Sequence, residues 1–264
     1  MTSPVSVLVA SRVRSQLAYP ASFWTNVATS ALIGVIEYVE IYALLSSVPV
    51  LGGLDLVQAT LVYALANLGF ALADLVFGSL DTIPTLLRAG QLEALLVRPL
   101  PLMLQLVASD FQLRRLGRAA ASVVILAVVV PLAHVDWTAG RVYLLLVTPL
   151  AGAAIYGALF AAAGGLQFFV VDGAEITNAF VYGGGYAGQV PGSVLLAPLR
   201  VFFTFVAPAT LTGYLPALVL LGLGGPAWLP AWLGWFAPLF AVSAWVLASL
   251  AWRAGLHHFT GAGG

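Results

Sequence analysis

The amino-acid sequence predicts an all-α integral membrane protein, and three observations carry the prediction. Of the 264 residues, 61% are hydrophobic and 8% are charged, with a mean hydropathy of +1.03. Uncharged stretches recur along the chain, and at about 20 residues per crossing they allow roughly five to seven transmembrane helices. Eight of the 20 charged residues fall between Asp81 and Arg118. We therefore expect one transmembrane domain over residues 1–264, with six crossings and one main water-facing segment at 81–118.

The charge balance and the missing residue types exclude several classes of function. The net charge is zero, which predicts no nucleic-acid partner, and the absence of cysteine excludes disulfides, thiol catalysis and thiolate metal sites. All ten basic residues are arginine, whereas the phosphate-binding loop of ATPases requires a lysine. No catalytic arrangement is apparent. We expect no metal site either, because His134 with Asp136, and His257 with His258, lack further ligands at useful spacing.

Residues 1–23 predict an amphipathic helix lying in the membrane surface. Between Val5 and Leu17 apolar residues recur at helical spacing, with serine and arginine on the rest of the circumference. Aromatic residues then suit the polar–apolar boundary of a bilayer. The alternative of a frayed polar tail stays open. The apolar positions are Val5, Leu8, Val9, Val13 and Leu17, and the aromatic ones are Tyr19, Phe23 and Trp24.

Spans one and two are predicted at 24–48 and 56–80, with a turn between them. Span one contains Glu37 and Glu40 on one face, and span two contains Asp74 toward its inner end. A charge at mid-bilayer costs roughly 3 kcal/mol, and no arginine lies within a predicted span. We therefore expect these carboxyl groups to be protonated, to face water or to meet a partner subunit. They would line a translocation path or a subunit interface.

The segment 81–118 begins with a predicted helix and an apolar ridge. Asp81 and Thr82 can cap the helix, and Pro84 suits its first turn because proline lacks an amide hydrogen that the turn would leave unpaired. After Gly90, leucines recur at i, i+3 and i+4. Such a ridge could rest on lipid or dock a partner protein. It consists of Leu92, Leu95 and Leu96.

A second helix is predicted for the rest of this segment. The run from Arg98 to Pro101 ends the first helical region, because proline disfavours helical geometry in the residue before it. The helix that follows is expected to reach Arg118, with Asp110 and Arg114 at i, i+4 spacing.

The remaining chain predicts three spans and then a re-entrant pair of half-helices before the last span. Non-helical backbone at membrane depth has to face protein or a wet cavity, so the re-entrant pair should line an interior. Span three is expected at 119–135, span four from Arg141 to Val171, span five at 176–194, the re-entrant pair at 198–221 and span six at 228–252.

Glycines in span five match a dinucleotide fingerprint by their letters alone. The match is Gly183-x-Gly185-x-x-Gly188, but a nucleotide site needs an acidic residue further on, and no acid follows Glu175. Gly184 and Gly188 predict close helix packing in the membrane instead.

The arginines predict the orientation of the chain. With six spans and the amino terminus inside, eight arginines are cytoplasmic, whereas Arg141 and Arg200 are outside. Both termini are then cytoplasmic. If the 198–221 pair crossed fully, only Arg253 would change sides.

The run from Leu86 to Leu100, LLRAGQLEALLVRPL, resembles the loop between the second and third spans of type-two ABC exporter permeases. It is most similar to the six-span bacterial branch of the ABC-2 type transporter family. The stretch from Pro198 to Ala217 resembles the region before the last span of the same branch. One departure is Gln91, where that branch would have a second acidic residue.

The resemblance implies a permease that works as a pair, with a second permease chain of the same or a related sequence. Each permease would bear a separate cytoplasmic ABC ATPase subunit, two copies in all, and ATP and Mg would be bound there and not on this chain. Residues 1–23 would be the connecting helix, and 81–99 would hold the coupling helix. The ATPase-coupling residues would be Leu86, Leu87, Arg88, Gly90, Leu92, Glu93, Leu95, Leu96, Arg98 and Pro99.

The resemblance also implies a place and a task. The chain would lie in the bacterial cell (inner) membrane and export a substrate. Its apolar spans are compatible with a hydrophobic or lipid-like substrate, and equally with a polar solute that follows a narrow water-filled path. Alternatives are a self-sufficient secondary transporter or channel, which would need an internal repeat or coupled charges, and an intramembrane enzyme using Asp172 and Glu175. The translocation path or dimer interface would include Glu37, Glu40, Asp74, Gly184 and Gly188.

Overall fold

The computed structural model describes residues 4–170, 174–226 and 229–259. Within these residues the chain forms helices and no named β-strand, which confirms the all-α membrane class. Five helices are long and apolar enough to cross a membrane, and a sixth is counted if one bent pair of helices is a single span. The five are built on α2 (Pro20–Ser46), α3 (Leu56–Phe77), α7 (Leu116–Leu132), α8 (Ala139–Leu166) and α13 (Ala237–His258).

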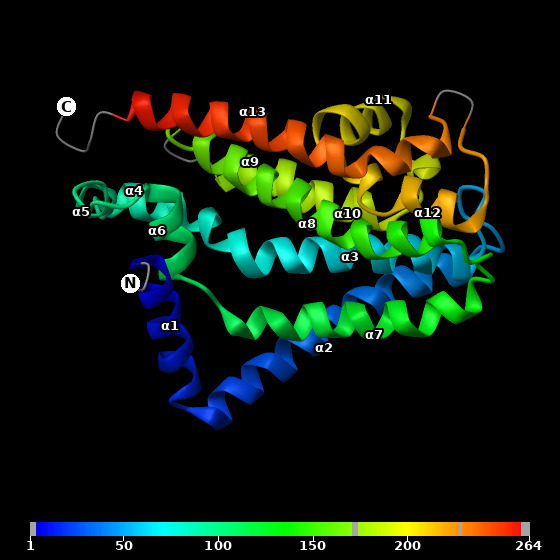
Figure 1. The fold of residues 1–264 in the computed structure, drawn as a ribbon, viewed down its shortest axis with the longest axis horizontal. Coiled ribbons are helices and arrows are strands. Elements are labelled where there is room, and N and C mark those ends of the chain that lie inside the picture. The colour runs from blue at the N-terminus through cyan, green and yellow to red at the C-terminus, as the bar shows by residue number, and fades with distance from the viewer. Residues whose placement is uncertain (1–3, 171–173, 227–228, 260–264) are drawn as a thin grey trace.

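The long helices lie side by side in one bundle (Figure 1). One end of the bundle carries three short helices of the predicted polar segment: α4 (Ile83–Arg88), α5 (Leu92–Leu96) and α6 (Leu102–Ser109). The first turn of α1 (Pro4–Leu17) and the last turn of α13 lie at this same end. The two ends of the described chain therefore lie at the same end of the bundle as these short helices.

The second span leads without a break into the polar segment. A capping box starts α3: Gln58 N donates to Asp55 Oδ1 (2.9 Å), and Asp55 N donates to Gln58 Oε1 (3.1 Å). At its other end α3 passes through the 3-10 turn η1 (Gly78–Thr82) directly into α4. The short helix α4 is therefore an extension of a membrane helix.

Close backbone contact holds α3 against α8 at the centre of the bundle. A Cβ at Gly69 would lie 3.1 Å from the Cα of Gly152, so neither position leaves room for a larger side chain. A large share of α3 and α8 is buried, whereas α2 is exposed along most of its length. The two central helices thus form the core, and α2 packs on its outside.

Several helix boundaries differ from the predicted spans. The third crossing is α7, entered through the 3-10 turn η2 (Leu113–Arg115), so Arg118 lies inside the helix and not before it. The last crossing is α13, preceded by η7 (Ala231–Phe236); its predicted start at Trp228 lies outside the described residues. The predicted end of span four at Val171 also lies outside them, and α8 ends at Leu166.

The fifth predicted span is shorter than expected. It consists of α9 (Ala174–Thr177), the π-helical turn η3 (Asn178–Tyr182) and α10 (Gly183–Gln189). This segment rises only about 24 Å, less than the roughly 30 Å of a bilayer core. It ends at Gln189 because Val190 is extended and Pro191 follows.

Two half-helices bent by 70° follow, at the place predicted for the re-entrant pair. They lie at the end of the bundle away from α4 and α5 (Figure 1). The bend also fits a broken span, so the re-entrant assignment stays a prediction. After the 3-10 turn η4 (Gly192–Val194), the first half is α11 (Ala197–Val201) with the π-helical turn η5 (Phe202–Val206), and the second is η6 (Ala209–Leu211) with α12 (Tyr214–Leu221).

Candidate coupling surface and intramembrane polar cluster

A glycine closes the first helix of the polar segment. Gly90 has a φ of +59°, the left-handed conformation that L side chains rarely adopt. Gln91 N donates to the carbonyl of Leu86 (3.0 Å), and Gly90 N donates to that of Leu87 (3.1 Å). This pair of bonds is a Schellman motif, which satisfies the last carbonyls of α4 and turns the chain into α5.

The predicted cap at the start of α4 is wrong. Thr82 occupies the N-cap position, but its hydroxyl donates to the carbonyl of Ser79 (2.7 Å) instead of capping the helix. The carboxylate of Asp81 accepts from the hydroxyl of Tyr182 (3.1 Å) on η3. No cap is needed, because η1 already leads into α4. Pro84 does sit in the first turn, as predicted.

The leucine ridge of α5 faces mainly into the protein. Leu92 is fully buried at 0% exposure, and Leu95 is half-buried against the same hydrophobic cluster. Leu96 and Val97 point outward, and Val97 is 84% exposed. The side chain of Gln105 holds this arrangement by donating to the carbonyls of Leu95 (2.9 Å) and Leu100 (2.7 Å).

We name the exposed residues between Arg88 and Pro99 the coupling surface. It contains two arginines at its margins and an apolar tip between them, and the predicted Leu86, Leu87, Leu92, Glu93 and Leu95 lie behind it, fully or partly buried. The coupling surface consists of Arg88, Ala89, Gly90, Gln91, Ala94, Leu96, Val97, Arg98 and Pro99.

The predicted second helix up to Arg118 is interrupted. The helix α6 ends at Ser109, and the chain leaves helical geometry at Asp110 before η2 begins. Asp110 and Arg114 are therefore not one helical turn apart. Gln112 joins them instead: its amide nitrogen donates to Asp110 Oδ2 (2.7 Å), and Arg114 Nε donates to its amide oxygen (2.7 Å).

Arginines on α7 and η2 meet two of the predicted intramembrane carboxylates. Arg115 Nη1 lies 3.0 Å from Asp74 Oδ1, and Arg118 forms an ion pair with Glu37. The inference that no arginine could offset these charges is wrong, because it placed the start of the third span at Ala119. These two carboxylates are paired within the chain.

An amide network continues from the ion pairs toward the middle of the bundle. The fully buried Asn67 donates to Tyr63 Oη (3.1 Å) and to Ser122 Oγ (3.0 Å), and it accepts from Gln189 Nε2 (3.2 Å). A cavity of about 170 Å³ lies beside this network, lined in part by Glu37 and Gln189. We name Glu37, Asn67, Asp74, Arg115, Arg118 and Gln189 the intramembrane polar cluster.

Three further residues that the sequence singled out lie elsewhere. Glu40 is exposed on the outer face of α2. Gly184 and Gly188 are buried inside the chain, and a Cβ at either would meet Tyr156 of α8. Gly188 therefore allows close packing within one chain, as predicted, whereas a side chain at Gly184 would make only ordinary van der Waals contacts. Their place on a translocation path stays a prediction.

Sequence patterns gave no sign of the glutamine contacts. Four glutamines make side-chain hydrogen bonds to another element or across a break: Gln16, Gln105, Gln112 and Gln189. The only feature of the sequence that could have indicated these contacts is a single polar residue in an apolar stretch.

Comparison with known protein families gives one match. The family model described as ABC-2 family transporter protein matches residues 31–263, which is most of the chain. Neither a curated protein nor a solved structure matches the chain.

Proposed function

Because this chain belongs to the ABC-2 family of transporter proteins, we propose that it is the membrane permease of an ATP-driven exporter whose ATPase is a separate chain. Family membership makes it a multi-pass transport subunit of an ABC transporter. One observation carries the proposal further: α4 is continuous with the buried helix α3, so a force on the coupling surface acts on the core of the bundle.

The coupling surface has the chemistry of a docking site for a protein. Leu96 and Val97 expose apolar area at the tip, and Arg88 and Arg98 are exposed cations of the same segment. A partner with an apolar groove and an acidic rim would fit it. The lysine-free chain lacks the residue that a phosphate-binding loop needs, so such a partner would supply ATP hydrolysis.

The ion pairs offer a route from the docking site to the other helices. Arg115 holds the start of α7 to Asp74 on α3, and Tyr182 holds η3 to Asp81. A tilt of α3 with α4 would therefore pull on both neighbours. Glu37 and Arg118 extend this connection to α2 beside the small polar cavity, which we propose as part of the substrate path.

The outer face of α2 supports a pair of permease chains. It exposes Ile36, Val39 and the carboxylate of Glu40 along one side. A charge facing lipid is costly, and a second copy of α2, or of a related chain, would cover it. The pair would bind two ATPases on the cytoplasmic side of a bacterial inner membrane, where both termini would lie.

Purification of the tagged chain from its native membrane in mild detergent tests this function. We expect a stoichiometric partner that carries a phosphate-binding loop with its lysine. A chain that purifies alone, and that moves solute down an ion gradient after reconstitution, would instead be a secondary transporter or channel.

A further inference from the structure

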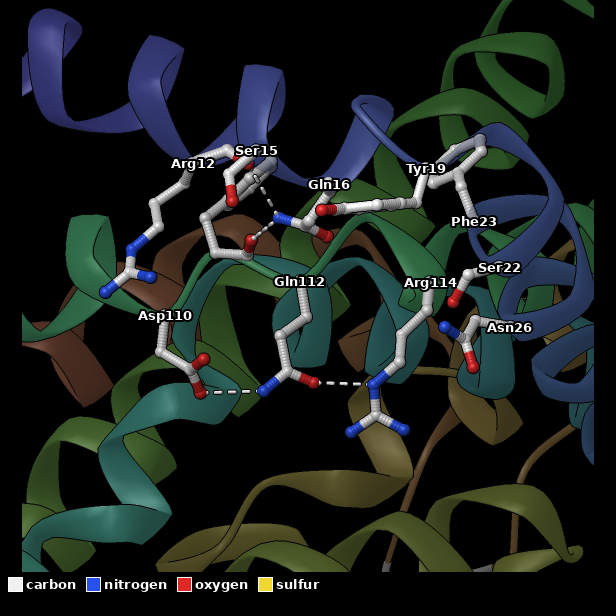
Figure 2. A pocket seen from close by; sticks show the side chains of 11 residues that line it. Arg12, Ser15, Gln16, Tyr19, Ser22, Phe23, Asn26, Asp110, Gln112 and Arg114 are labelled. Atoms are coloured by element: carbon white, nitrogen blue, oxygen red, sulfur yellow. Dashed lines mark hydrogen bonds between the residues drawn. The ribbon is translucent and has the colours of Figure 1, made fainter.

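A polar pocket lies at the junction of α1, α2 and the break after α6 (Figure 2). Its volume is about 380 Å³. Residues of α1 form one wall, and the hydrogen-bonded row Asp110, Gln112 and Arg114 forms the opposite wall. It lies outside the coupling surface and the intramembrane polar cluster.

A glutamine fixes the shape of this pocket. Gln16 donates from Nε2 to the carbonyl of Phe111 (2.6 Å), and its Oε1 accepts from Leu113 N (2.9 Å). One side chain of α1 thus satisfies two backbone groups that the break between α6 and η2 leaves unpaired. The helix α1 is thereby held against the bundle with the pocket between them.

Hydrogen-bond donors of exposed side chains line this space. Within the described chain, the guanidinium of Arg12 and the hydroxyls of Ser15 and Ser22 make no hydrogen bond to another group. Arg114 uses only its Nε, on Gln112, so both of its terminal nitrogens are available. Asn26 adds an amide at the same end of the pocket as Ser22 (Figure 2).

The charge in the pocket selects among anions. Arg12 and Arg114 are positive and Asp110 is negative, which leaves a net charge of about +1 when all three are ionised. A phosphodiester carries one negative charge and offers several acceptor oxygens to guanidinium groups. A phosphate monoester carries more charge, about −1.5 to −2 at neutral pH, and fits this balance less well.

The position of the pocket matches the headgroup layer of a bilayer. Tyr19 and Phe23 line it, and Tyr19 is 75% exposed, as is typical of aromatic residues at a membrane–water boundary. The helix α1, whose residues line the pocket, lies at the end of the bundle that carries the coupling surface (Figure 1).

We propose that this pocket binds the phosphodiester headgroup of an anionic phospholipid such as phosphatidylglycerol. Arg12 and Arg114 bind the phosphate, Ser15, Ser22 and Asn26 bind its oxygens and the glycerol, and the acyl chains lie along the exposed face of α2. The bound lipid holds α1 to the start of the third crossing. This assignment does not depend on the identity of the ATPase.

Lipid titration followed by native mass spectrometry of the purified chain tests the proposal. Phosphatidylglycerol should bind Arg12→Gln and Arg114→Gln each about fivefold more weakly than the unaltered chain, the change that corresponds to about 1 kcal/mol per arginine. Arg14→Gln is the matched control, because Arg14 lies on the same helix and does not line the pocket. It should bind as the unaltered chain does.

A second variant separates the pocket from charge in general. Ser15→Trp fills the space and keeps every charge, and it should lose phosphatidylglycerol binding as Arg12→Gln does. Equal losses for Arg14→Gln and Arg12→Gln, or full binding by Ser15→Trp, would overturn the proposal in favour of attraction to a basic helix. Displacement of the lipid by an equal concentration of inorganic phosphate would overturn it in favour of a soluble ligand.

Discussion

The guanidinium of Arg115 at the start of α7 lies 3.0 Å from the carboxylate of Asp74 near the end of α3, with both side chains largely shielded from solvent. The same guanidinium also donates to the backbone carbonyl of Asp74. Gly78 leaves the space for it, because a Cβ there would collide with the arginine. The pair ties the helix that continues into the coupling surface to the third crossing.

Breaking this pair should destabilise the protein. Asp74→Asn leaves the shielded charge of Arg115 without its partner, which we expect to lower the free energy of unfolding by about 3 kcal/mol. The charge-exchanged double variant Asp74→Arg with Arg115→Asp should recover part of the loss. Thermal unfolding in detergent measures both. Glu40→Gln, which removes an exposed carboxylate of α2, is the control, and a loss as large as that of Asp74→Asn would deny the pair a stabilising role.

Substitutions on α5 should separate docking from folding. Val97→Asp changes only exposed surface, so we expect a folded chain that no longer retains the ATPase through purification. Leu92→Asp buries a carboxylate in the core and should instead lower the yield of folded chain. Size-exclusion profiles report folding, and the amount of co-purified ATPase reports docking. An unchanged amount of co-purified ATPase in the Val97→Asp sample would show that the tip of the coupling surface does not contact the ATPase.

The turn after α4 should depend on the left-handed geometry of Gly90. An L side chain in that conformation costs about 1–2 kcal/mol, so Gly90→Ala should lower stability by that amount and weaken ATPase retention. Gly90→Asn should lose less, because asparagine tolerates the conformation better. The control is Gly183→Ala in helical geometry, where the added Cβ would meet only the Asn178 carbonyl at 3.5 Å. Equal melting temperatures for Gly90→Ala and the unaltered chain would contradict the assigned role.

The exposed face of α2 should be the contact between permease chains. The chain has no cysteine, so Val39→Cys introduces a single thiol, and two copies paired along α2 should form a disulfide dimer under oxidation. Val242→Cys, at a similarly exposed position but on α13, should stay monomeric on a non-reducing gel. Dimers from Val242 and none from Val39 would place the interface on α13. If the natural partner is a related chain, the Val39 thiol would cross-link only when that chain also carries a cysteine.

The sequence predicted the fold class and most spans because long apolar runs indicate membrane helices, and prolines and glycines indicate where helices end. It missed the partner of Glu37 because Arg118 falls at a helix start, where a shift of three residues decides whether an arginine lies inside the membrane. The helical spacing predicted the leucine ridge of α5 but not the direction in which it faces. That direction depends on the hydrogen bonds of Gln105 and on packing against the core. The break at Asp110 was not predicted because neither proline nor glycine occurs there.

The docking of a separate ATPase on the coupling surface is the central claim, and cross-linking in native membranes tests it most directly. Val97→Cys carries one photoactivatable reagent on an otherwise cysteine-free chain, and Trp232→Cys, exposed on η7 away from the coupling surface, carries the same reagent as control. We expect Val97 to cross-link to a protein with a phosphate-binding loop, and Trp232 not to do so. Cross-links from Val97 to lipid alone, or the same products from both positions, would contradict the claim.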